Sequence, residues 1–494
     1  MQWISSLTSS SSTDLSEHIQ SPPAGTDVVE IRLDLLPGAD IGALVAASSR
    51  PVLVTLRSQA EGGQGPDDRE QRKHVLKTAV ESGAHLIDLE WARDTELIDQ
   101  LGLSPEKVVL SWHDTQGTPE NLADIAVAML GEPGVLVKVV PTSKTLGDLE
   151  KVLSLSTPAV TPSKKDRQRL MAFAMGPVGV PTRYLAPLLG APIGFAAWSA
   201  DAPAAPGQQT AQRMNAAIGH LQGPPRRLFG VVGADVTTSL SPSLHGAAFS
   251  ATRMPDLLIP ISVPDPEELR LLFNPFGETL FDRLGLPAHG WAVTAPYKIR
   301  AAEVATDMAP RVKRAGAANT LLLKPGRIIA ENTDADGVVG SLTAASMPMA
   351  GATALVQGLG GAARGAAIGL HLAGAEVTLR GRDSDRTRKV AETLGIGWCD
   401  PDDRAGAEIL VNATPLGRQE NDALPFSQSE IEMAGAIVDM VYGEQKTALV
   451  KGAEDKGLVV IDGLTMLAFQ GMAQFAAFTT TPPPRQEMLR SIGR

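Results

Sequence analysis

The sequence predicts an α/β protein in two parts, a (β/α)8 barrel followed by a two-domain α/β module that contains a Rossmann domain. Two observations support this fold class. Short apolar runs alternate with segments of helical periodicity from residue 1 to about residue 198. Farther along the chain, a glycine-rich turn separates an apolar run from an alanine-rich segment, which is typical of the first βα turn of a Rossmann domain.

Eight apolar, β-branched runs are the expected strands of the barrel. They are residues 1–7, 28–34, 52–57, 85–90, 107–112, 135–140, 170–175 and 193–198. Intervening segments such as 67–82, 119–130 and 146–155 have the periodicity of helices. An open doubly wound sheet is compatible with the same alternation and is the alternative architecture.

Ionisable residues gather at or just after the C-terminal ends of these runs. They are Glu30, Arg32, Arg57, Glu61, Asp88, Glu90, His113 and Lys138. Barrels of this kind build their active sites at this rim. The sequence therefore predicts one polar site there.

Lys138 lies in the run LVKVV, which a parallel strand would bury on both faces. Burial lowers the pKa of a lysine and gives a free amine that can attack a carbonyl and form a Schiff base. His113 ends the preceding strand in SWHD, where it could transfer protons to a substrate held by Lys138. The alternatives are a lysine paired with a neighbouring glutamate and a structural histidine.

Two arginines near the same rim suit an anionic ligand. Arg57 ends a strand before the glycine-rich turn 58–63, and Arg183 follows Gly179. The segment 206–208, Pro-Gly-Gln, has the composition of a loop that closes over a site.

Five ordered motifs carry a family resemblance over the first 220 residues or so. They are EIRLD (30–34), TLRSQAEGG (55–63), SWHD (111–114), VKVVP (137–141) and APGQ (205–208). Together they resemble the type I 3-dehydroquinate dehydratases, which implies a TIM barrel. The resemblance implies that Lys138 forms an imine with the C3 ketone, that His113 is the general acid and base, and that Glu61 assists it.

The same resemblance implies the substrate contacts of the barrel. These are Glu30, Arg32, Arg57 and Arg183, with Gln208 in the lid. Ala204 stands where the family usually has a serine, which affects a lid contact and leaves the chemistry intact.

The segment GPPRRL at residues 223–228 interrupts the periodicity and marks the expected domain boundary. Downstream, GLGGAARG at 358–365 lies between expected strands at 354–357 and 376–379. Such glycines let the backbone approach a pyrophosphate at a helix N-terminus. The second strand is followed by RGRDSDR (380–386), whose arginines favour the 2′-phosphate of NADP, whereas Asp383 argues against that preference.

Residues 228–335 are expected to form a separate substrate unit, because hydroxyl and amide side chains recur in short clusters. The clusters are TSLSP (238–242), AVTAPYK (292–298), ANT (318–320), ENTD (331–334) and, near the C-terminus, DGLTML (462–467) with Gln470. Such side chains suit a polyhydroxylated ligand, and a lysine with an aspartate can serve the reduction of a ketone. Taken singly, each cluster is also typical of a turn or a helix cap.

Taken together, these clusters resemble the shikimate dehydrogenases along residues 228–494. The motifs are SLSPSLH, VTAPYK, GAANT, ENTDADG, GLGGAAR, VNATPLG, DMVY and DGLTMLAFQ. The resemblance implies Lys298 and Asp334 as the catalytic pair. It implies substrate contacts from Ser239, Ser241, Thr294, Asn319 and Gln470. It implies cofactor contacts from Gly358, Gly360, Gly361, Ala362, Arg382 and Arg386, with Met466 near the nicotinamide. Thr238, Ala292 and Gly381 depart from the family pattern, and Gly381 with Asp383 could weaken the preference for NADP.

The two resemblances predict three domains, at residues 1–222, at 228–335 completed by about 465–494, and at 336–464. They imply a bifunctional enzyme that dehydrates 3-dehydroquinate to 3-dehydroshikimate through a Schiff base and reduces the product to shikimate with NADPH. One alternative is a catalytically silent regulator that responds to quinate or shikimate. The other is a quinate dehydrogenase that uses NAD.

The composition limits the classes of partner and the cellular location that we expect for this protein. With 44 Lys and Arg against 55 Asp and Glu, a net charge of −11 argues against a general affinity for nucleic acid or anionic membranes and leaves small molecules as the expected partners. The single cysteine, Cys399, excludes a disulfide framework and predicts a reduced, cytoplasmic protein, and we expect no metal. The start, MQWISSLTSSSSTD, lacks the regions of a secretory signal. No assembly motif defines an oligomeric state.

Overall fold

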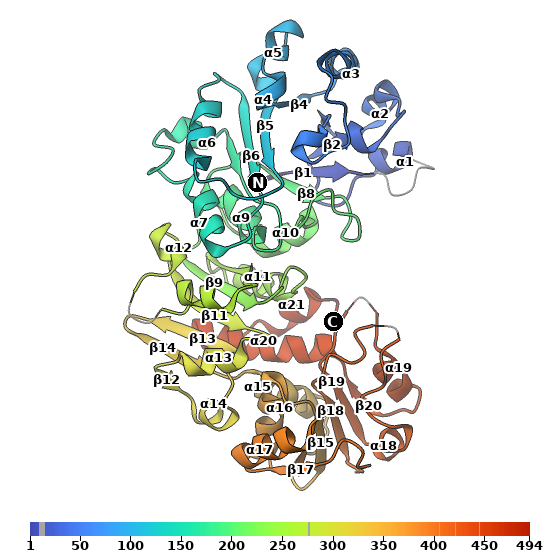
Figure 1. The fold of residues 1–494 in the computed structure, drawn as a ribbon. Helices are drawn as coiled ribbons and strands as arrows, with labels where there is room; N and C mark the ends of the chain where they lie inside the picture. Colours follow the sequence, from blue (N-terminus) through green and yellow to red (C-terminus); the bar gives the residue numbers. More distant parts are fainter. Residues whose placement is uncertain (9–14, 275–276, 405, 420, 444) are drawn as a thin grey trace.

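The computed structural model describes residues 1–8, 15–274, 277–404, 406–419, 421–443 and 445–494 (Figure 1). Residues 9–14 lie outside the described residues. They belong to the N-terminal stretch in which we expect no secretory signal. In Figure 1 the N-terminal module lies at the top, and the two sheets of the second module lie below it.

The N-terminal module is a barrel of eight parallel strands in the order β7-β6-β5-β4-β3-β2-β1-β8. The strands are β1 (Gln2–Leu7), β2 (Val28–Arg32), β3 (Val52–Thr55), β4 (Leu86–Glu90), β5 (Val108–Asp114), β6 (Leu136–Pro141), β7 (Leu170–Ala172) and β8 (Ile193–Ala197). Side chains from all eight strands, among them Ile4 of β1, Val109 of β5 and Met171 of β7, pack in one buried cluster, so the sheet curls around a common interior. The predicted (β/α)8 barrel is therefore confirmed, and the open sheet is not what forms.

Helices separate these strands. They are α1 (Leu15–Gln20), α2 (Ile41–Ala47), α3 (Arg69–Glu81), α4 (Trp91–Asp94), α5 (Leu97–Gln100), α6 (Leu122–Leu130), α7 (Leu146–Ser154), α8 (Lys164–Arg167), α9 (Val180–Leu185) and α10 (Ala211–Ile218). Local capping explains where several begin: Asp68 caps α3, and Thr145 with Asp148 forms a capping box at α7.

The second module begins with a mixed sheet in the order β10-β9-β11-β13-β14-β12. Its strands are β9 (Arg227–Gly233), β10 (Asp256–Ser262), β11 (Ala288–Val293), β12 (Asp307–Met308), β13 (Thr320–Lys324) and β14 (Arg327–Glu331). Its helices are α11 (Ser241–Ala251), α12 (Leu280–Arg283), α13 (Lys298–Glu303) and α14 (Pro310–Ala315). Strand β13 pairs antiparallel with both β11 and β14.

The last sheet is parallel and has the order β17-β16-β15-β18-β19-β20. Its strands are β15 (Thr353–Gln357), β16 (Glu376–Arg380), β17 (Gly397–Cys399), β18 (Ile409–Asn412), β19 (Ala436–Asp439) and β20 (Val459–Ile461). Its helices are α15 (Asp334–Ala344), α16 (Gly361–Leu372), α17 (Ser384–Leu394), α18 (Gln428–Met433) and α19 (Ala448–Glu454). Numbered within this sheet, the order is 3-2-1-4-5-6, so the predicted Rossmann domain is confirmed.

The chain then returns to the mixed sheet through α20 (Gly463–Thr479) and α21 (Arg485–Arg490) (Figure 1). The apolar face of α20, including Phe475 and Phe478, packs with Phe229 of β9 and Phe249 of α11 in one buried cluster. Since α15 also packs against α20, these two helices connect the two sheets.

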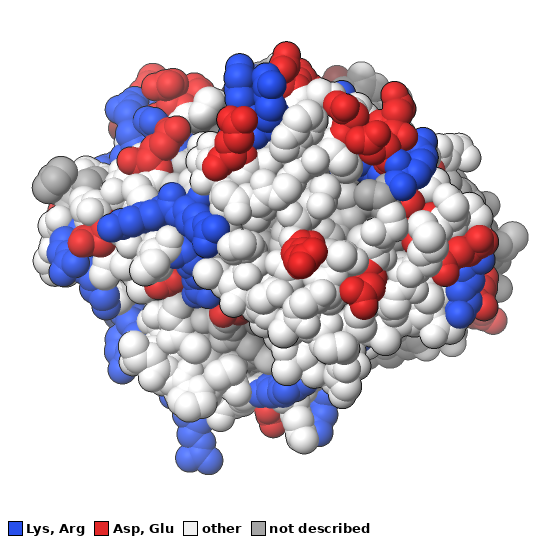
Figure 2. All heavy atoms as spheres, turned by 90° about the horizontal axis from the view of Figure 1, so that it is seen from below, with Lys and Arg blue, Asp and Glu red and all other residues white. Residues whose placement is uncertain are grey.

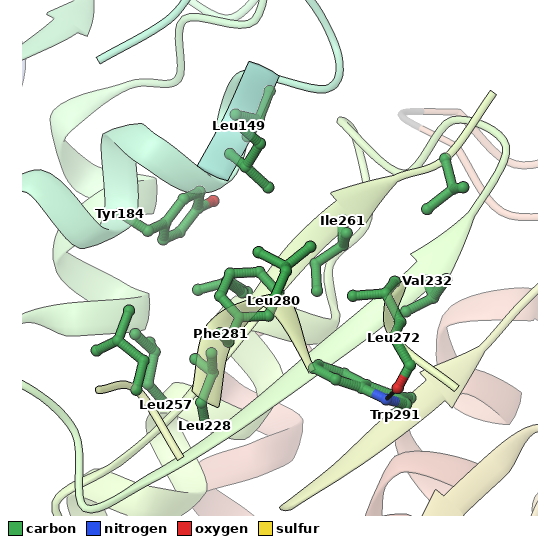
Figure 3. Packing of buried hydrophobic residues seen from close by; sticks show 14 of the residues in the cluster. Leu149, Tyr184, Leu228, Val232, Leu257, Ile261, Leu272, Leu280, Phe281 and Trp291 are labelled. Atoms are coloured by element: carbon green, nitrogen blue, oxygen red, sulfur yellow. Dashed lines mark hydrogen bonds between the residues drawn. The ribbon is translucent and has the colours of Figure 1, made fainter. Parts of the chain in front are cut away.

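One apolar core joins the barrel to the mixed sheet (Figure 3). Leu149 of α7 and Tyr184 of α9 point toward Leu280 and Phe281 of α12, and all four side chains are buried. Polar contacts flank this core. The Glu268 carboxylate accepts hydrogen bonds from the Leu146 N–H at 3.0 and 3.1 Å. Arg283 pairs with both carboxylate oxygens of Glu150 at 2.8 and 2.7 Å.

On the face shown in Figure 2, basic and acidic side chains lie mixed around the rim, and the centre is mostly uncharged. As far as its described residues show, that face has no continuous basic area of the kind that binds a polyanion. Among the helices of the described residues, none is both long and apolar enough to cross a membrane.

Candidate active sites

Lys138 of β6 lies at the centre of the barrel site and is only 5% exposed. Its Nζ is 3.4 Å from Asp88 Oδ2 and 3.9 Å from Glu30 Oε1. The ammonium group also lies 4.1 Å above the ring centroid of Phe195. Burial lowers the pKa of Lys138, although the two carboxylates oppose that shift. A free amine is therefore more accessible here than on a surface lysine.

His113, near the end of β5, is paired with Glu61 of the short 3-10 helix Gln59–Glu61. The distance from His113 Nδ1 to Glu61 Oε2 is 2.9 Å. Burial, together with the charges of Arg57 and Lys138, holds the pKa of His113 well below its usual value. Burial raises the pKa of Glu61 to about 8, with Arg57 opposing the shift. A neutral imidazole therefore faces a carboxyl group that holds its proton near neutral pH.

Arg57 is held by the protein itself. Its guanidinium donates to Asp88 Oδ1, Glu61 Oε2 and Ser111 Oγ, each at 2.9 Å, and to Glu90 Oε1 at 3.3 Å. Its two terminal nitrogens are thus engaged by protein oxygens, while its side chain still lines the cavity. Arg57 and Lys138 together hold the pKa of Asp88 below its usual value against the effect of burial. Arg57 thereby keeps Asp88 negatively charged beside Lys138.

Arg183 of α9 is a cation of this site that has unused donors. It is 5% exposed, and its guanidinium lies 4.8 Å from the Phe173 ring centroid. Its Nε and Nη2 atoms are buried, and within the described part of the chain they have no hydrogen-bond partner. Burial lowers the pKa of Arg183 to about 10, so it remains charged at neutral pH. A buried guanidinium with free N–H groups is suited to a carboxylate ligand.

Gln208 lines the same cavity and is held by two hydrogen bonds. Its Nε2 donates to Ser6 Oγ at 3.2 Å, and its Oε1 accepts from the Ala204 N–H at 3.0 Å. Because the second bond uses the backbone of residue 204, the absence of the family's serine hydroxyl at that position does not prevent Gln208 from being held in the loop.

A cavity of about 250 Å³ brings these groups together. All eight residues predicted for the barrel site line it: Glu30, Arg32, Arg57, Glu61, His113, Lys138, Arg183 and Gln208. Its wall is otherwise largely apolar, with Val140, Phe173, Met175 and Phe195 among the lining residues. The cavity therefore combines a buried amine, a proton-transferring pair and an anion site.

In the second module, Lys298 begins α13 and Asp334 begins α15, and the two form a direct pair. The Lys298 Nζ lies 2.5 Å from Asp334 Oδ2. Asn319 Nδ2 donates to the other carboxylate oxygen, Asp334 Oδ1, at 3.0 Å. A carboxylate at a helix N-terminus also interacts favourably with the helix dipole. Asp334 is thus fixed in place by partners on both of its oxygens.

Asn319 connects this pair to the substrate side chains. Its Nδ2 also donates to Thr333 Oγ1 at 3.0 Å and to Gln470 Oε1 at 3.3 Å, and its Oδ1 accepts from the Thr333 N–H at 2.8 Å. Gln470 comes from α20, more than 130 residues along the chain from Thr333. The network explains how a C-terminal helix contributes a side chain beside Asn319, Thr333 and Asp334, which lie far earlier in the chain.

A cavity of about 260 Å³ lies next to this network. Nine predicted site residues line it: Ser239, Ser241, Thr294, Lys298, Asn319, Asp334, Ala362, Met466 and Gln470. The other predicted cofactor residues are not among its lining residues. They follow the carboxyl ends of β15 and β16 in the chain and are Gly358, Gly360, Gly361, Arg382 and Arg386.

The turn between β15 and α16 fits a dinucleotide. Gly358 has a φ of +125°, which L side chains rarely adopt, and a Cβ there would lie 2.9 Å from Ala413 O. No heavy atom lies within 4 Å of a Cβ built on Gly360, so that backbone is open to a close approach. A Cβ on Gly361 would lie 2.5 Å from Lys298 Cβ. The turn thus leaves room for a pyrophosphate and also packs against Lys298.

Four charged residues at the end of β16 and just after it have different surroundings. Arg382 and Arg386 are exposed at this edge. Asp383 caps α17 by accepting from the Arg386 N–H at 2.9 Å, which accounts for the aspartate that had argued against NADP. Arg380 is buried against Glu430 at 2.6 Å, so this arginine of the RGRDSDR run is structural.

Several residues of the two sites had no predicted role. In the barrel, Asp88 belonged to the predicted rim but not to the site, and Phe195 lines the cavity from an apolar strand that gives no sequence signal for a pocket. In the second module, Tyr442 and Arg418 line the cavity. Tyr442 lies within the DMVY motif, so its signal was present in the sequence.

The fold and the two sites define a two-part protein, a lysine-centred α/β barrel followed by a Rossmann module with a Lys-Asp pair. Residues 4–224 match the family described as type I 3-dehydroquinase, and residues 231–321 match the shikimate dehydrogenase substrate binding domain.

Known proteins match over the same parts. A bifunctional 3-dehydroquinate dehydratase/shikimate dehydrogenase, chloroplastic, of Arabidopsis thaliana is 29% identical, over 94% of this chain and 79% of its own. A shikimate dehydrogenase (NADP(+)) of Rubrobacter xylanophilus is 34% identical, over 54% of this chain and 95% of its own. A crystal structure of shikimate 5-dehydrogenase from Thermus thermophilus in complex with NADP(H) and shikimate is 31% identical, covers 54% of this chain and 98% of that chain, and has a TM-score of 0.48.

The chain therefore belongs to the shikimate dehydrogenase family, with a type I 3-dehydroquinase domain preceding the dehydrogenase in the same polypeptide.

Proposed function

We propose that this chain catalyses two consecutive steps of the shikimate pathway. The barrel dehydrates 3-dehydroquinate to 3-dehydroshikimate, and the second module reduces 3-dehydroshikimate to shikimate with NADPH. The observation that carries the proposal is the similarity to a bifunctional enzyme of that name over 94% of the chain. The buried Lys138 and the Lys298–Asp334 pair, one in each cavity, support it.

In the barrel, Lys138 attacks the C3 ketone and forms an imine with loss of water. The protonated imine withdraws electrons and acidifies the neighbouring C2 proton. After that proton is removed, the resulting enamine expels the C1 hydroxyl as a second water, and hydrolysis of the imine releases the product. Asp88, kept ionised by Arg57, stabilises the positive charge that develops on the Lys138 nitrogen.

His113 transfers the protons in these steps, and Glu61 sets which way it acts. When Glu61 carries a proton it donates to Nδ1, so Nε2 bears hydrogen and can donate to the substrate. When that proton lies on Nδ1, Nε2 has a free lone pair and can accept one. Arg183, with two unpaired donor atoms, would bind the substrate carboxylate.

In the second module, Lys298 would donate a proton to the oxygen at C3 as the ketone is reduced, with Asp334 holding the ammonium group in place. NADPH supplies the hydride when bound. Asn319 and Gln470 orient the substrate hydroxyls, and Ser239 and Ser241 face the same cavity. The glycine turn would hold the pyrophosphate, with Arg382 and Arg386 near the 2′-phosphate.

We also propose the module limits 1–222, 228–335 with about 465–494, and 336–464. Membership of three separate sheets supports them. A cytoplasmic location is proposed on the single cysteine. The proposed partners are the small-molecule substrates alone.

The experiment is a coupled assay. The purified protein is mixed with 3-dehydroquinate and NADPH, and the loss of NADPH absorbance is followed. Steady oxidation is expected, because the product of the barrel is the substrate of the second site. If only 3-dehydroshikimate supports oxidation, the proposed dehydratase activity is wrong. If neither compound does, the proposed reductase activity is wrong, and the dehydratase step then has to be assayed by itself. Parallel assays of shikimate and quinate, each with NADP and NAD, test the substrate and cofactor preference.

A further inference from the structure

Arg213 is part of the barrel in sequence but bonds to the dehydrogenase site. It lies on α10, the last helix of the barrel, and its Nη2 donates to the backbone carbonyl of Ser239 at 2.5 Å. Ser239 precedes α11 by two residues and lines the dehydrogenase cavity together with Ser241. One hydrogen bond thus runs from the dehydratase module to the loop that carries two predicted substrate contacts.

Helix packing fixes the position of Arg213. A Cβ on Gly246 of α11 would lie 2.4 Å from Ala216 O and 2.8 Å from Ala217 Cα of α10. The two helices therefore meet backbone to backbone, and Ala217 is fully buried. Since α10 cannot slide freely on α11, the Arg213 side chain is held over the start of α11.

The charge of Arg213 also acts on a second residue that lines the same cavity, Tyr442. Burial raises the pKa of Tyr442, and the positive charges of Arg418 and Arg213 oppose that shift. Tyr442 and Arg418 line the cavity together with Ser239. Arg213 therefore acts on two residues of this cavity, on Ser239 through a hydrogen bond and on Tyr442 through its charge.

The surroundings of Arg213 argue against a purely stabilising role. Its Nε is buried and has no hydrogen-bond partner among the described residues, and an unsatisfied buried donor costs free energy. The shikimate dehydrogenase of Rubrobacter xylanophilus matches only 54% of this chain while covering 95% of its own length. The family reaction therefore does not depend on a barrel, and Arg213 is expected to adjust substrate binding rather than to supply chemistry.

We infer that Arg213 is a positioning residue of the dehydrogenase site, supplied by the dehydratase module, which holds the Ser239 loop in the geometry that binds 3-dehydroshikimate. The inference rests on the proposed reduction of 3-dehydroshikimate. It adds that the second site of this chain is completed by a residue of the first module.

The test compares Arg213→Gln and Arg213→Met with a matched control, Arg283→Met. Arg283 makes a different contact between the modules, a hydrogen-bonded ion pair with Glu150, and is not among the residues that line either cavity. Loss of one positioning hydrogen bond should raise KM for 3-dehydroshikimate about tenfold and leave kcat within about twofold. KM for NADPH and the dehydratase activity should be unchanged. Arg213→Lys, which keeps the charge and a donor, should restore part of the loss.

Each outcome decides the inference. A wild-type KM in the two Arg213 variants overturns it, and so does an equal rise in Arg283→Met, because the effect would then come from a loosened interface. Loss of dehydratase activity in both Arg213 variants would show that the residue maintains the barrel fold instead, which also overturns it. If the unmutated protein does not reduce 3-dehydroshikimate with NADPH, the proposed function itself is wrong. That result distinguishes its failure from a failure of the inference about Arg213.

Discussion

At the scale of single residues, the surroundings of Lys138 favour both a neutral amine and the positively charged imine that forms from it. Burial favours the neutral amine needed for attack, whereas Asp88 and Glu30 favour the cationic imine that follows. Asp88 can serve the second form because Arg57 keeps it ionised. The charged residues around Lys138 therefore contribute to the proposed reaction as well as to the fold.

Lys138 should be trapped covalently by borohydride in the presence of 3-dehydroquinate. Reduction of the imine gives a stable secondary amine, so the intact mass should increase by one reduced ligand. Lys138→Ala should show no adduct and should lose at least about a thousandfold in dehydratase kcat. An active protein whose mass stays unchanged under these conditions would contradict the assignment.

Glu61 should make stability depend on pH. Its pKa is raised from 4.5 to about 8 in the folded protein, so the folded state binds a proton that the unfolded state has released. The stabilising contribution is complete below pH 4.5 and is lost as the pH rises through about 8. Relative to Glu61→Gln, the wild-type free energy of unfolding should therefore fall over that window and be constant above it. Denaturant unfolding at several pH values measures the difference, and a parallel pH dependence of both proteins would refute it.

At the scale of elements, the glycines of α16 allow close packing, and the glycine just before the helix leaves its N-terminus open. Gly361, Gly365 and Gly369 recur on one face, and a Cβ on each would press on Lys298, Asn332 or Ala335. Gly360, one residue before α16, is open instead. The same helix therefore packs against Lys298 and Asp334, the proposed catalytic pair, and has an open N-terminus where we propose that the cofactor binds.

Gly361→Ala should damage catalysis, because the new methyl group would overlap Lys298 Cβ at 2.5 Å. Overpacking of this kind costs about 1–3 kcal/mol, so the melting temperature should fall. The reductase kcat should fall about tenfold as Lys298 is displaced.

Gly360→Ala is the matched control for Gly361→Ala. It has room for its methyl group and should keep the melting temperature while raising KM for NADPH. Equal effects of the two substitutions would show that Gly361 does not pack on the catalytic pair in the manner described.

At the scale of the whole molecule, the two cavities belong to different modules that share one apolar core. Tyr184 of the barrel and Phe281 of the second module are buried in that core, and Glu268 caps the α7 N-terminus across the boundary. Apart from the Arg213 contact, the catalytic groups of each site come from their own module. The chemistry of the two sites should therefore be separable even though the modules are packed together.

Lys298→Ala should abolish most reduction of 3-dehydroshikimate, with a loss of about 10²–10⁴ in kcat, because no other group replaces the proton donor. The dehydratase rate of the same preparation should equal that of the wild type. Separate assays of each step measure this, and simultaneous loss of both activities would argue against independent sites.

The sequence by itself determined the strand positions and the two architectures, and its resemblances to two families supplied the candidate site residues. Each of these depends on local information. Apolar runs and helical periodicity mark the barrel strands within a few residues, and glycines at 358, 360 and 361 mark a turn whose geometry only glycine allows at its first position. Ordered motifs such as SWHD and DMVY add the chemistry, since they keep reactive side chains at the ends of strands.

Only the tertiary structure decided how distant charges are paired. The sequence does not distinguish Arg380, buried against Glu430, from exposed Arg382, and it does not show that Arg57 is engaged by carboxylates while Arg183 has free donors. Nor does it show that Arg213 of the barrel bonds to Ser239. The physical reason is that a side chain's charge state and partner depend on burial and on contacts between elements, which arise only when the elements pack.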